Sequence, residues 1–513
     1  MARRGTTKVR TGCITCKLRR VKCDEARPSC NRCTSTGRKC DGYAKPPNGS
    51  YSWSQLLWIT PPPTQTASQA DLRALSFFHN VVAPGLTGPM DNYFWTHLVS
   101  QVSHQEEAAK HAALAISSLY ENFKEDPLDR SGVRNAFAMA HYNQALKCLM
   151  TTNNHETVLV VCILFICIEM LRGECKSAID HCRHGITILN GASSKSRFVR
   201  EQLEPIFCRL EVFPFFFGSR PETFPTVAAP IPALETSFSN LIETQAALDP
   251  LLVHAIRFVL RGDAYRLGDE LSPKPDASTL QERGNIDAAF DKWFVAFRVY
   301  QKQKARERRR GNARTERIFE CMLEMTWLVG KLWIDTCLSR GETVFDLHLD
   351  KFRAIVALAR QAEALLAQTE TRCSRPKFMF EMGFTPLLSF VVIKCRSLSL
   401  RIAALRLMKS LAHEKENLWE LNAVLAFGHK TIEVEHDLCL AAEENLQDDA
   451  DDGTLPPEIW RIKDAVVHPE AHVKLAQNGV VTMERKVAFF MKEPEGPITV
   501  REERFSVTLG HKG

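Results

Sequence analysis

The chain has 513 residues, a length that allows two to four domains, and 45% of them are hydrophobic, which is enough for a sizeable core. Its net charge of +6 is unevenly divided, because residues 1–50 hold 13 Lys or Arg and three acids, whereas the remainder holds 53 basic and 57 acidic residues. The positive charge expected of a nucleic-acid-binding module is therefore concentrated at the N-terminus. The longest apolar run, Val158–Ile168, is shorter than the roughly 20 residues that span a bilayer, and no apolar run follows the basic N-terminus, so we expect neither a membrane span nor a signal peptide.

Residues 1–12 form a basic arm that we expect to lie along phosphates in a complex with nucleic acid. Residues 13–40 follow with an internal repeat, in which Cys-x2-Cys-x6-Cys occurs twice at Cys13, Cys16, Cys23, Cys30, Cys33 and Cys40. Zinc takes four ligands, and no histidine lies in this segment, so thiolates alone would bind it. Two zinc ions need eight ligand positions from six sulfurs, and the repeat makes Cys13 and Cys30 the natural bridging ligands.

Four cations stand between the second and third cysteines: Lys17, Arg19, Arg20 and Lys22. The matching stretch of the second repeat begins with small neutral residues. The asymmetry indicates that the first half faces a polyanion, since a short basic helix held by metal suits the DNA major groove. A disulfide framework would need an oxidising compartment, and a purely structural zinc module would leave the basic turn unexplained.

The segment resembles the fungal Zn(2)-Cys(6) binuclear cluster transcription factors over about 30 residues. The resemblance rests on Gly12-Cys13-x2-Cys16-Lys17-x-Arg19-Arg20-x-Lys22-Cys23-Asp24, followed by Pro28-x-Cys30-x2-Cys33 and Cys40. It implies that Arg20 reads a CGG triplet in the major groove, where an arginine can bind a guanine O6/N7 pair. Lys17, Arg19 and Lys22 would mainly contact phosphates.

From this pattern we expect two Zn²⁺ ions per chain, each with four thiolate ligands. One ion would be bound by Cys13, Cys16, Cys23 and Cys30, and the other by Cys13, Cys30, Cys33 and Cys40. Metal binding should then supply much of the folding free energy of so small a segment.

The rest of the chain is predicted to be mostly α-helical. Residues 41–70 are a Pro-rich linker without a heptad run, so a coiled-coil homodimer is not expected from it, although dimerisation by other contacts stays open. Residues 71–445 read as an all-α domain that resembles the regulatory region of the same factors. Its helices are predicted at Ala108–Phe123, Val133–Met150, Glu156–Leu171, Ala178–Leu189, Leu241–Leu267, Ala288–Gln303, Arg317–Cys337, Phe352–Ala367, Leu387–Leu411 and Leu418–Leu440.

Residues 446–513 are expected to form an acidic loop and a C-terminal tail. Asn478-Gly479 predicts a β-hairpin, and residues 500–513 are expected to be loose. The nine acids within Ile432–Asp452 indicate either an exposed acidic helix end or a segment that binds transcriptional co-regulators. The basic run Lys302–Arg310 is read as a solvated helix end, with nuclear import and a second DNA contact as alternatives.

The eleven cysteines outside the repeat are scattered and are interpreted as buried reduced thiols in a reducing compartment, with redox sensing as the alternative. No phosphate-binding loop, His-Glu-x-x-His or Gly-x-Ser-x-Gly motif occurs, so an enzyme is not expected.

Two functions follow. The first is a nuclear, sequence-specific regulator of transcription that binds double-stranded DNA and controls a metabolic or secondary-metabolite biosynthetic gene cluster. The second is a zinc-stapled protein-interaction module that does not read DNA.

Overall fold

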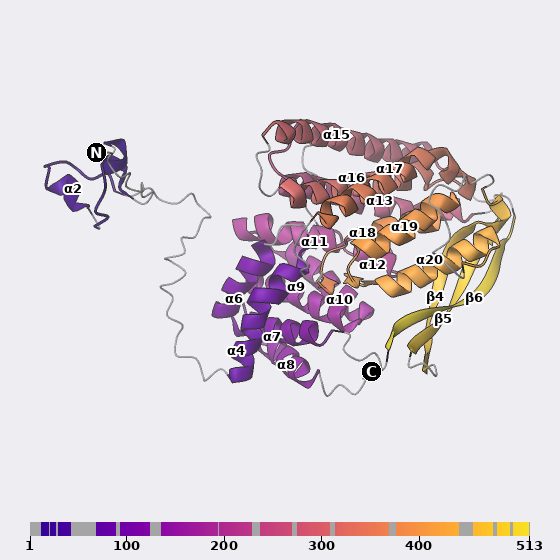
Figure 1. Ribbon diagram of the computed structural model, residues 1–513, viewed down its shortest axis with the longest axis horizontal. Helices are drawn as coiled ribbons and strands as arrows, with labels where there is room; N and C mark the ends of the chain where they lie inside the picture. Colours follow the sequence, from indigo (N-terminus) through magenta and orange to yellow (C-terminus); the bar gives the residue numbers. More distant parts are fainter. Residues whose placement is uncertain are drawn as a thin grey trace. The chain divides into compact units, whose positions relative to one another are not determined.

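The computed structural model describes residues 12–19, 21–26, 29–42, 68–88, 93–123, 135–192, 194–227, 236–268, 274–307, 313–368, 376–440, 455–475, 480–492 and 496–511. The chain divides into two compact units, Met1–Ala67 and Ser68–Gly513 (Figure 1). The expected architecture is confirmed in outline, because the molecule is mostly helical and carries a cysteine cluster in the first unit and a small sheet at the C-terminal end of the second.

The first unit has two short helices, α1 (Ile14–Leu18) and α2 (Asn31–Thr34), each of which begins directly after the first cysteine of a repeat. The second unit begins with a group of helices around one hydrophobic cluster. These are α4 (Gln69–Phe77), η1 (Phe78–Val82), α5 (Ala83–Leu86), η2 (Phe94–Leu98), α6 (Val99–Gln105), α7 (Glu107–Glu121), α8 (Ala136–Met150), α9 (His155–Arg172), α10 (Cys175–Gly191), η3 (Val199–Leu203), α11 (Glu204–Leu210) and α12 (Phe213–Phe216).

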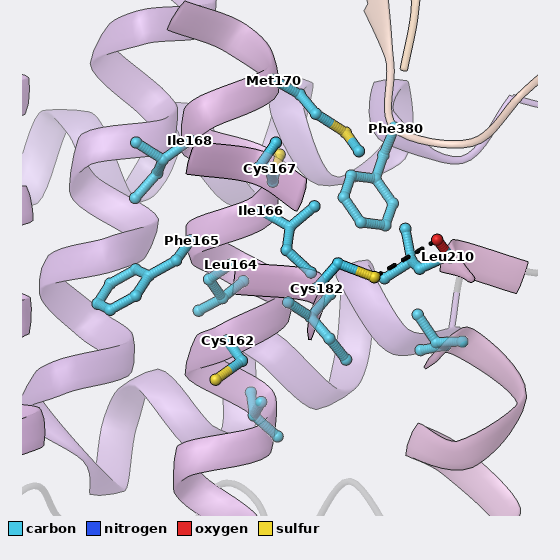
Figure 2. Packing of buried hydrophobic residues seen from close by; sticks show 14 of the residues in the cluster. Cys162, Leu164, Phe165, Ile166, Cys167, Ile168, Met170, Cys182, Leu210 and Phe380 are labelled. Carbon is cyan, nitrogen blue, oxygen red and sulfur yellow. Dashed lines mark hydrogen bonds between the residues drawn. The ribbon is translucent and has the colours of Figure 1, made fainter. Parts of the chain in front are cut away.

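Helix α9 is the centre of this group, and it is buried on all sides, as its apolar run predicts. Asn154 caps its first turn by accepting hydrogen bonds from two backbone N–H groups, and Gly173 ends it at φ 78°. Figure 2 shows Cys162 and Cys167 of α9 among Leu, Ile and Phe side chains, and Cys182 of α10 donating to the Leu210 carbonyl oxygen at 3.4 Å. Of the ten described cysteines outside the repeat, seven are buried, which supports their interpretation as small hydrophobic side chains.

A second group of helices packs around a second hydrophobic cluster. These are α13 (Leu241–Arg261), α14 (Asp263–Arg266), α15 (Ala277–Glu307), α16 (Ala313–Thr336), η4 (Glu342–His348), α17 (Leu349–Ala367), α18 (Phe384–Lys394), α19 (Leu398–Leu411) and α20 (Leu421–His436). A minor sheet joins β1 (Phe378–Met379), β2 (Lys415–Glu416) and β3 (Trp419–Glu420), with β1 parallel and β3 antiparallel to β2.

The single helix expected over residues 387–411 is wrong, because the chain leaves the helix between α18 and α19. Arg396 lies in this break, fully buried, and its guanidinium binds Glu342 and Glu435 at 3.1 Å each. Ser397 then caps α19 by accepting from the Leu400 N–H. Glu435, at the end of α20, is also fully buried and pairs with Arg401 as well, so this acid does not belong to an exposed acidic surface.

The C-terminal end of the chain is a three-stranded antiparallel sheet preceded by η6 (Glu458–Trp460). It consists of β4 (Ile462–Leu475), β5 (Val480–Lys492) and β6 (Ile498–His511), in the order β4-β5-β6. The expected hairpin is present, with Leu475 opposite Val481, while its turn lies outside the described residues. Residues 500–511 are not loose, because they belong to β6, whose Phe505 packs with Phe427 of α20 at 6.1 Å between ring centroids.

Among the described helices, none combines the length and the apolarity that crossing a bilayer requires.

Candidate metal centre and nucleic-acid interface

The Cys-x2-Cys spacing places two sulfurs at the start of each short helix. Cys13 is the N-cap of α1, where its Sγ accepts a hydrogen bond from the Cys16 N–H at 3.3 Å. Cys30 is the N-cap of α2, and its carbonyl oxygen accepts from the Cys33 N–H at 3.0 Å. Because an N-cap residue and the residue three positions later lie on the same side of a helical turn, both pairs of sulfurs can face a common centre.

The four buried sulfurs lie about as far apart as two ligands of one tetrahedral zinc do, although Cys16 and Cys33 would bind different ions. Sγ of Cys13 is 3.6 Å from Sγ of Cys30 and 3.8 Å from that of Cys33, and Sγ of Cys16 is 3.7 Å and 3.8 Å from the same two atoms. A tetrahedron with zinc–sulfur bonds of about 2.3 Å has sulfur–sulfur edges of about 3.8 Å.

The six sulfurs fall into two overlapping quartets, in each of which every sulfur lies within 4.8 Å of the other three. The quartets are Cys13, Cys16, Cys23 and Cys30, and Cys13, Cys30, Cys33 and Cys40. Cys13 and Cys30 occur in both, so the structure brings together all six cysteines singled out in the sequence. This donor set, all thiol and closed on itself, fits structural zinc, and not calcium or magnesium, which prefer oxygen ligands.

Burial favours the protonated form of three of the six thiols. Burial raises the pKa of Cys13 to about 12 and also raises the pKa values of Cys16 and Cys30. Cys40 differs, because backbone hydrogen bonds from Cys30 and Gly42 lower its pKa. Since the thiolate is the zinc ligand, zinc would have to displace protons from the buried sulfurs.

Two polar contacts close the segment around the sulfurs, and neither was predicted from the sequence. The Thr15 hydroxyl donates to the Asp41 carboxylate at 2.8 Å and accepts from the Asp41 N–H at 2.9 Å. The Asp24 carboxylate accepts from the Asn31 and Arg32 N–H groups at 2.9 and 3.1 Å, and these bonds, that of Arg32 first, lower its pKa. Asp24 thereby satisfies N–H groups at the start of α2 that no preceding turn can pair.

Gly12 leaves room for the third cysteine. A Cβ added at this position would lie 2.9 Å from Cβ of Cys23, closer than side chains pack. The sequence showed this glycine only as part of the motif, whereas the structure gives it a steric role beside the first quartet.

The basic residues between the second and third cysteines lie on and after α1. Lys17 and Lys22 are exposed, and Arg19, the C-cap of α1, is partly buried. Leu18 lies between them and is 78% exposed. Arg20, the residue expected to read bases, lies outside the described residues. The described cations thus leave a solvent-facing positive surface on the α1 side of the sulfur cluster.

Comparison with known proteins agrees with this geometry. The model of the fungal Zn(2)-Cys(6) binuclear cluster domain matches residues 11–50. The "Aspercryptin biosynthesis cluster-specific transcription regulator atnN" of Emericella nidulans is 33% identical over an alignment of 216 positions, which covers 35% of this chain and 34% of that protein. The "Transcriptional regulatory protein moc3" of Schizosaccharomyces pombe is 28% identical over 150 residues, 29% of this chain and 28% of that protein.

A third relative is the "Transcription regulator lscL" of Purpureocillium lilacinum, which is 25% identical over an alignment of 205 positions that covers 34% of this chain and 48% of that protein. The matched part of the chain thus spans between about a quarter and half of the length of these relatives. No solved structure matches the chain. Residues 11–50 are therefore a zinc-binding fungal Zn(2)-Cys(6) binuclear cluster domain, in a chain that is similar to fungal transcription regulators.

Proposed function

We propose that the chain is a nuclear, sequence-specific transcription factor that binds double-stranded DNA through residues 13–40. The observation that carries the proposal is the pair of thiol quartets sharing Cys13 and Cys30, with the exposed Lys17 on α1 and the exposed Lys22 just after it. The family match over residues 11–50 and the names of the relatives support it independently.

Two zinc ions per chain would be bound by the two quartets, with Cys13 and Cys30 bridging. The ions would supply fixed attachment points that orient α1, and the basic side chains would make the contacts with DNA. Lys17, Arg19 and Lys22 neutralise phosphates, and Arg20 reads one base pair of a CGG triplet with its guanidinium. This division between phosphate contacts and one base contact is the one that the resemblance to the family implies.

The test is binding of the zinc-loaded full chain to a pool of random duplexes, followed by sequencing of the bound fraction. Enrichment of CGG triplets is the expected result. The affinity should also fall steeply with salt, since each neutralised phosphate adds roughly −0.9 to the slope of log affinity against log salt. An absence of any enriched motif, with zinc bound, would favour the zinc-stapled protein-interaction module.

Three substitutions distinguish the expected roles. Arg20→Ala should cost about 1–3 kcal/mol and relax preference at one position of the triplet. Lys22→Ala should weaken all duplexes alike and reduce the salt slope by about 1. Lys39→Ala is the matched control, because Lys39 is also an exposed lysine, but of the second repeat, and its loss is expected to leave the salt slope unchanged.

We propose the following organisation for the whole chain: a basic arm at 1–12, the DNA-binding domain at 13–40, a linker at 41–70, a helical regulatory domain at 71–445 and a C-terminal segment at 446–513. The relative named for a biosynthesis cluster supports control of a secondary-metabolite or other metabolic gene cluster. Genome-wide occupancy of the tagged protein tests that role. Paired triplets at a fixed spacing would indicate a homodimer, and a lone triplet a monomer.

A further inference from the structure

The helical unit contains a cavity of about 420 Å³ where its two hydrophobic clusters meet. Helices α11, α13, α16 and α18, which are labelled in Figure 1, contribute residues to its walls, and each contacts the next in this series. Several aromatic rings in the lining lie close together: Phe216 lies 6.0 Å from Trp333 and 5.5 Å from Trp419 between centroids, and Trp333 lies 6.3 Å from Phe390. Such a wall favours an apolar occupant.

The volume sets the size of that occupant. A buried apolar cavity of about 150 Å³ takes up benzene, so about 420 Å³ corresponds by proportion to about 17 non-hydrogen atoms. The value also lies within the range of about 300–1,000 Å³ that is usual for small-molecule sites.

One set of polar groups in the lining is already paired within the protein. Glu342 accepts from Lys394 at 3.0 Å and lies 3.8 Å from Arg266, which also reaches Asp464 at 3.4 Å. These charges neutralise one another, so they leave little attraction for a ligand's polar group.

Asp249 of α13 is different. Its side chain is more than nine-tenths buried, it lines the cavity, and its Oδ2 has no hydrogen-bond partner among the described residues. Arg209 lies 3.7 Å from this oxygen, but it donates instead to Glu381, at 3.2 and 3.3 Å. A buried carboxylate oxygen without a donor is costly unless a partner reaches it.

The charges of Arg209 and Glu381 act on the pKa of Asp249. Burial raises the pKa of Asp249 to about 7, an effect that Arg209 opposes and the Glu381 charge reinforces. A hydrogen-bond donor brought to Oδ2 would stabilise the ionised carboxylate.

We propose that this cavity binds a mostly apolar small molecule whose hydroxyl or amino group donates a hydrogen bond to Asp249. The site lies wholly within the helical unit and is separate from the cysteine cluster, so the proposal goes beyond DNA binding. It assigns the helical unit a ligand-responsive role set by the shape and polarity of the cavity.

Dodecanol, dodecylamine and dodecyl methyl ether test this with the zinc-loaded full chain. Their binding is followed by tryptophan fluorescence, since Trp333 and Trp419 line the cavity. We expect dodecanol or dodecylamine to bind about tenfold more tightly than the ether, which has no donor to offer. Preference for the alcohol or for the amine identifies the donor. Equal affinity of all three compounds, or no saturable binding of any, would overturn the proposal.

Asp249→Leu removes the acceptor at similar volume and should lower the affinity for the preferred donor compound to that for the ether. Asp180→Leu on α10 is the control, because Asp180 pairs with Arg183 at the surface and does not line the cavity. If Asp249→Leu fails to fold, Val259→Phe, which fills part of the cavity, should reduce binding of all three probes. Unchanged binding by the folded variants would place the probes elsewhere and refute the assignment.

Discussion

Glu435→Gln should strongly destabilise the helical unit, because it removes the negative charge at the centre of a buried ion network. Glu435 and both its arginine partners are fully buried, and the carboxylate also accepts from the Ile462 N–H at 2.6 Å. Burial alone would raise the pKa of Glu435, but Arg396 and Arg401 outweigh it and hold the pKa below its ordinary value. The carboxylate is therefore ionised, and it joins α20 to the α18–α19 break and to the start of β4.

The magnitude follows from what the substitution leaves behind. Arg396 keeps Glu342 as a partner, whereas Arg401 keeps the Ile393 and Cys395 carbonyl oxygens and loses its carboxylate. Leaving one buried charge uncompensated costs about 3–5 kcal/mol, a large part of the roughly 5–15 kcal/mol that separates folded from unfolded proteins.

The assay is urea unfolding followed by tryptophan fluorescence, with the shift of the midpoint giving the change in the free energy of unfolding. Glu433→Gln is the matched control on the same helix, because Glu433 pairs with Lys430 at 2.8 Å with both side chains 24% exposed, a geometry expected to contribute less than about 1 kcal/mol. If the two variants lose equal stability, the buried ion network does not contribute the roughly 3–5 kcal/mol expected here.

Three further outcomes are expected. Cys30→Ser should lose more zinc than Cys40→Ser, measured by metal analysis of the purified chain, since Cys30 belongs to both quartets and Cys40 to one; equal loss would contradict bridging. Gly12→Ala should weaken zinc retention against a chelator, because the new Cβ would meet Cys23. Gly37→Ala is the comparison variant: its new Cβ meets no atom within 4 Å but strains a backbone at φ 63°, so the two variants distinguish a steric effect from a backbone effect. The Nδ1 atoms of His111 and His141 lie 2.8 Å apart, and burial lowers the pKa of each imidazole. Below about pH 6.5, the ordinary pKa of histidine, the unfolded chain therefore binds more protons than the folded chain. The melting temperature should therefore hold above that pH and fall as the pH drops through the lowered values, and His141→Gln should reduce the dependence.

Most helices of the second unit could be predicted because their signals are local. Helix α9 carries a nearly continuous apolar run, with Asn154 before it and Gly173 after it as capping residues, so both its existence and its ends follow from neighbouring residues. The break before α19 could not be predicted in this way, because no glycine or proline marks it. Arg396 is held there by Glu342 and Glu435, which lie 54 and 39 residues away in the chain.

The last strand, β6, carries an alternation of buried and exposed residues that the sequence analysis did not assign to a strand. Phe505 and Val507 are buried on one face of β6, with exposed Arg504, Ser506 and Thr508 between and beside them. This alternation is typical of a half-buried strand. The charged residues that precede it, Arg501 to Arg504, conceal this alternation in the sequence, and in the structure they belong to the same strand, paired with β5.

At the cysteine cluster, the spacing alone was enough to indicate which sulfurs come together. The contacts that close the segment could not be predicted, since Thr15 and Asp41 are 26 residues apart and the cysteine motif specifies the identity of neither. A hydroxyl–carboxylate pair at that separation is recognised only once the two ends of the segment are seen side by side.

The two units differ in what holds them together, and this makes the two proposals independent of each other. The buried hydrophobic cluster of the first unit, among its described residues, consists of four cysteines, whereas the second unit has two extensive apolar clusters and a sheet packed on α20. So small a core cannot offset the conformational entropy of the segment, and zinc must supply the difference. Chelation should therefore abolish DNA binding while the helical unit and its cavity remain folded. Ligand binding that survives metal removal would show that the cavity depends on the helical fold alone, whereas its loss would mean that the cavity requires the zinc domain and would contradict this division.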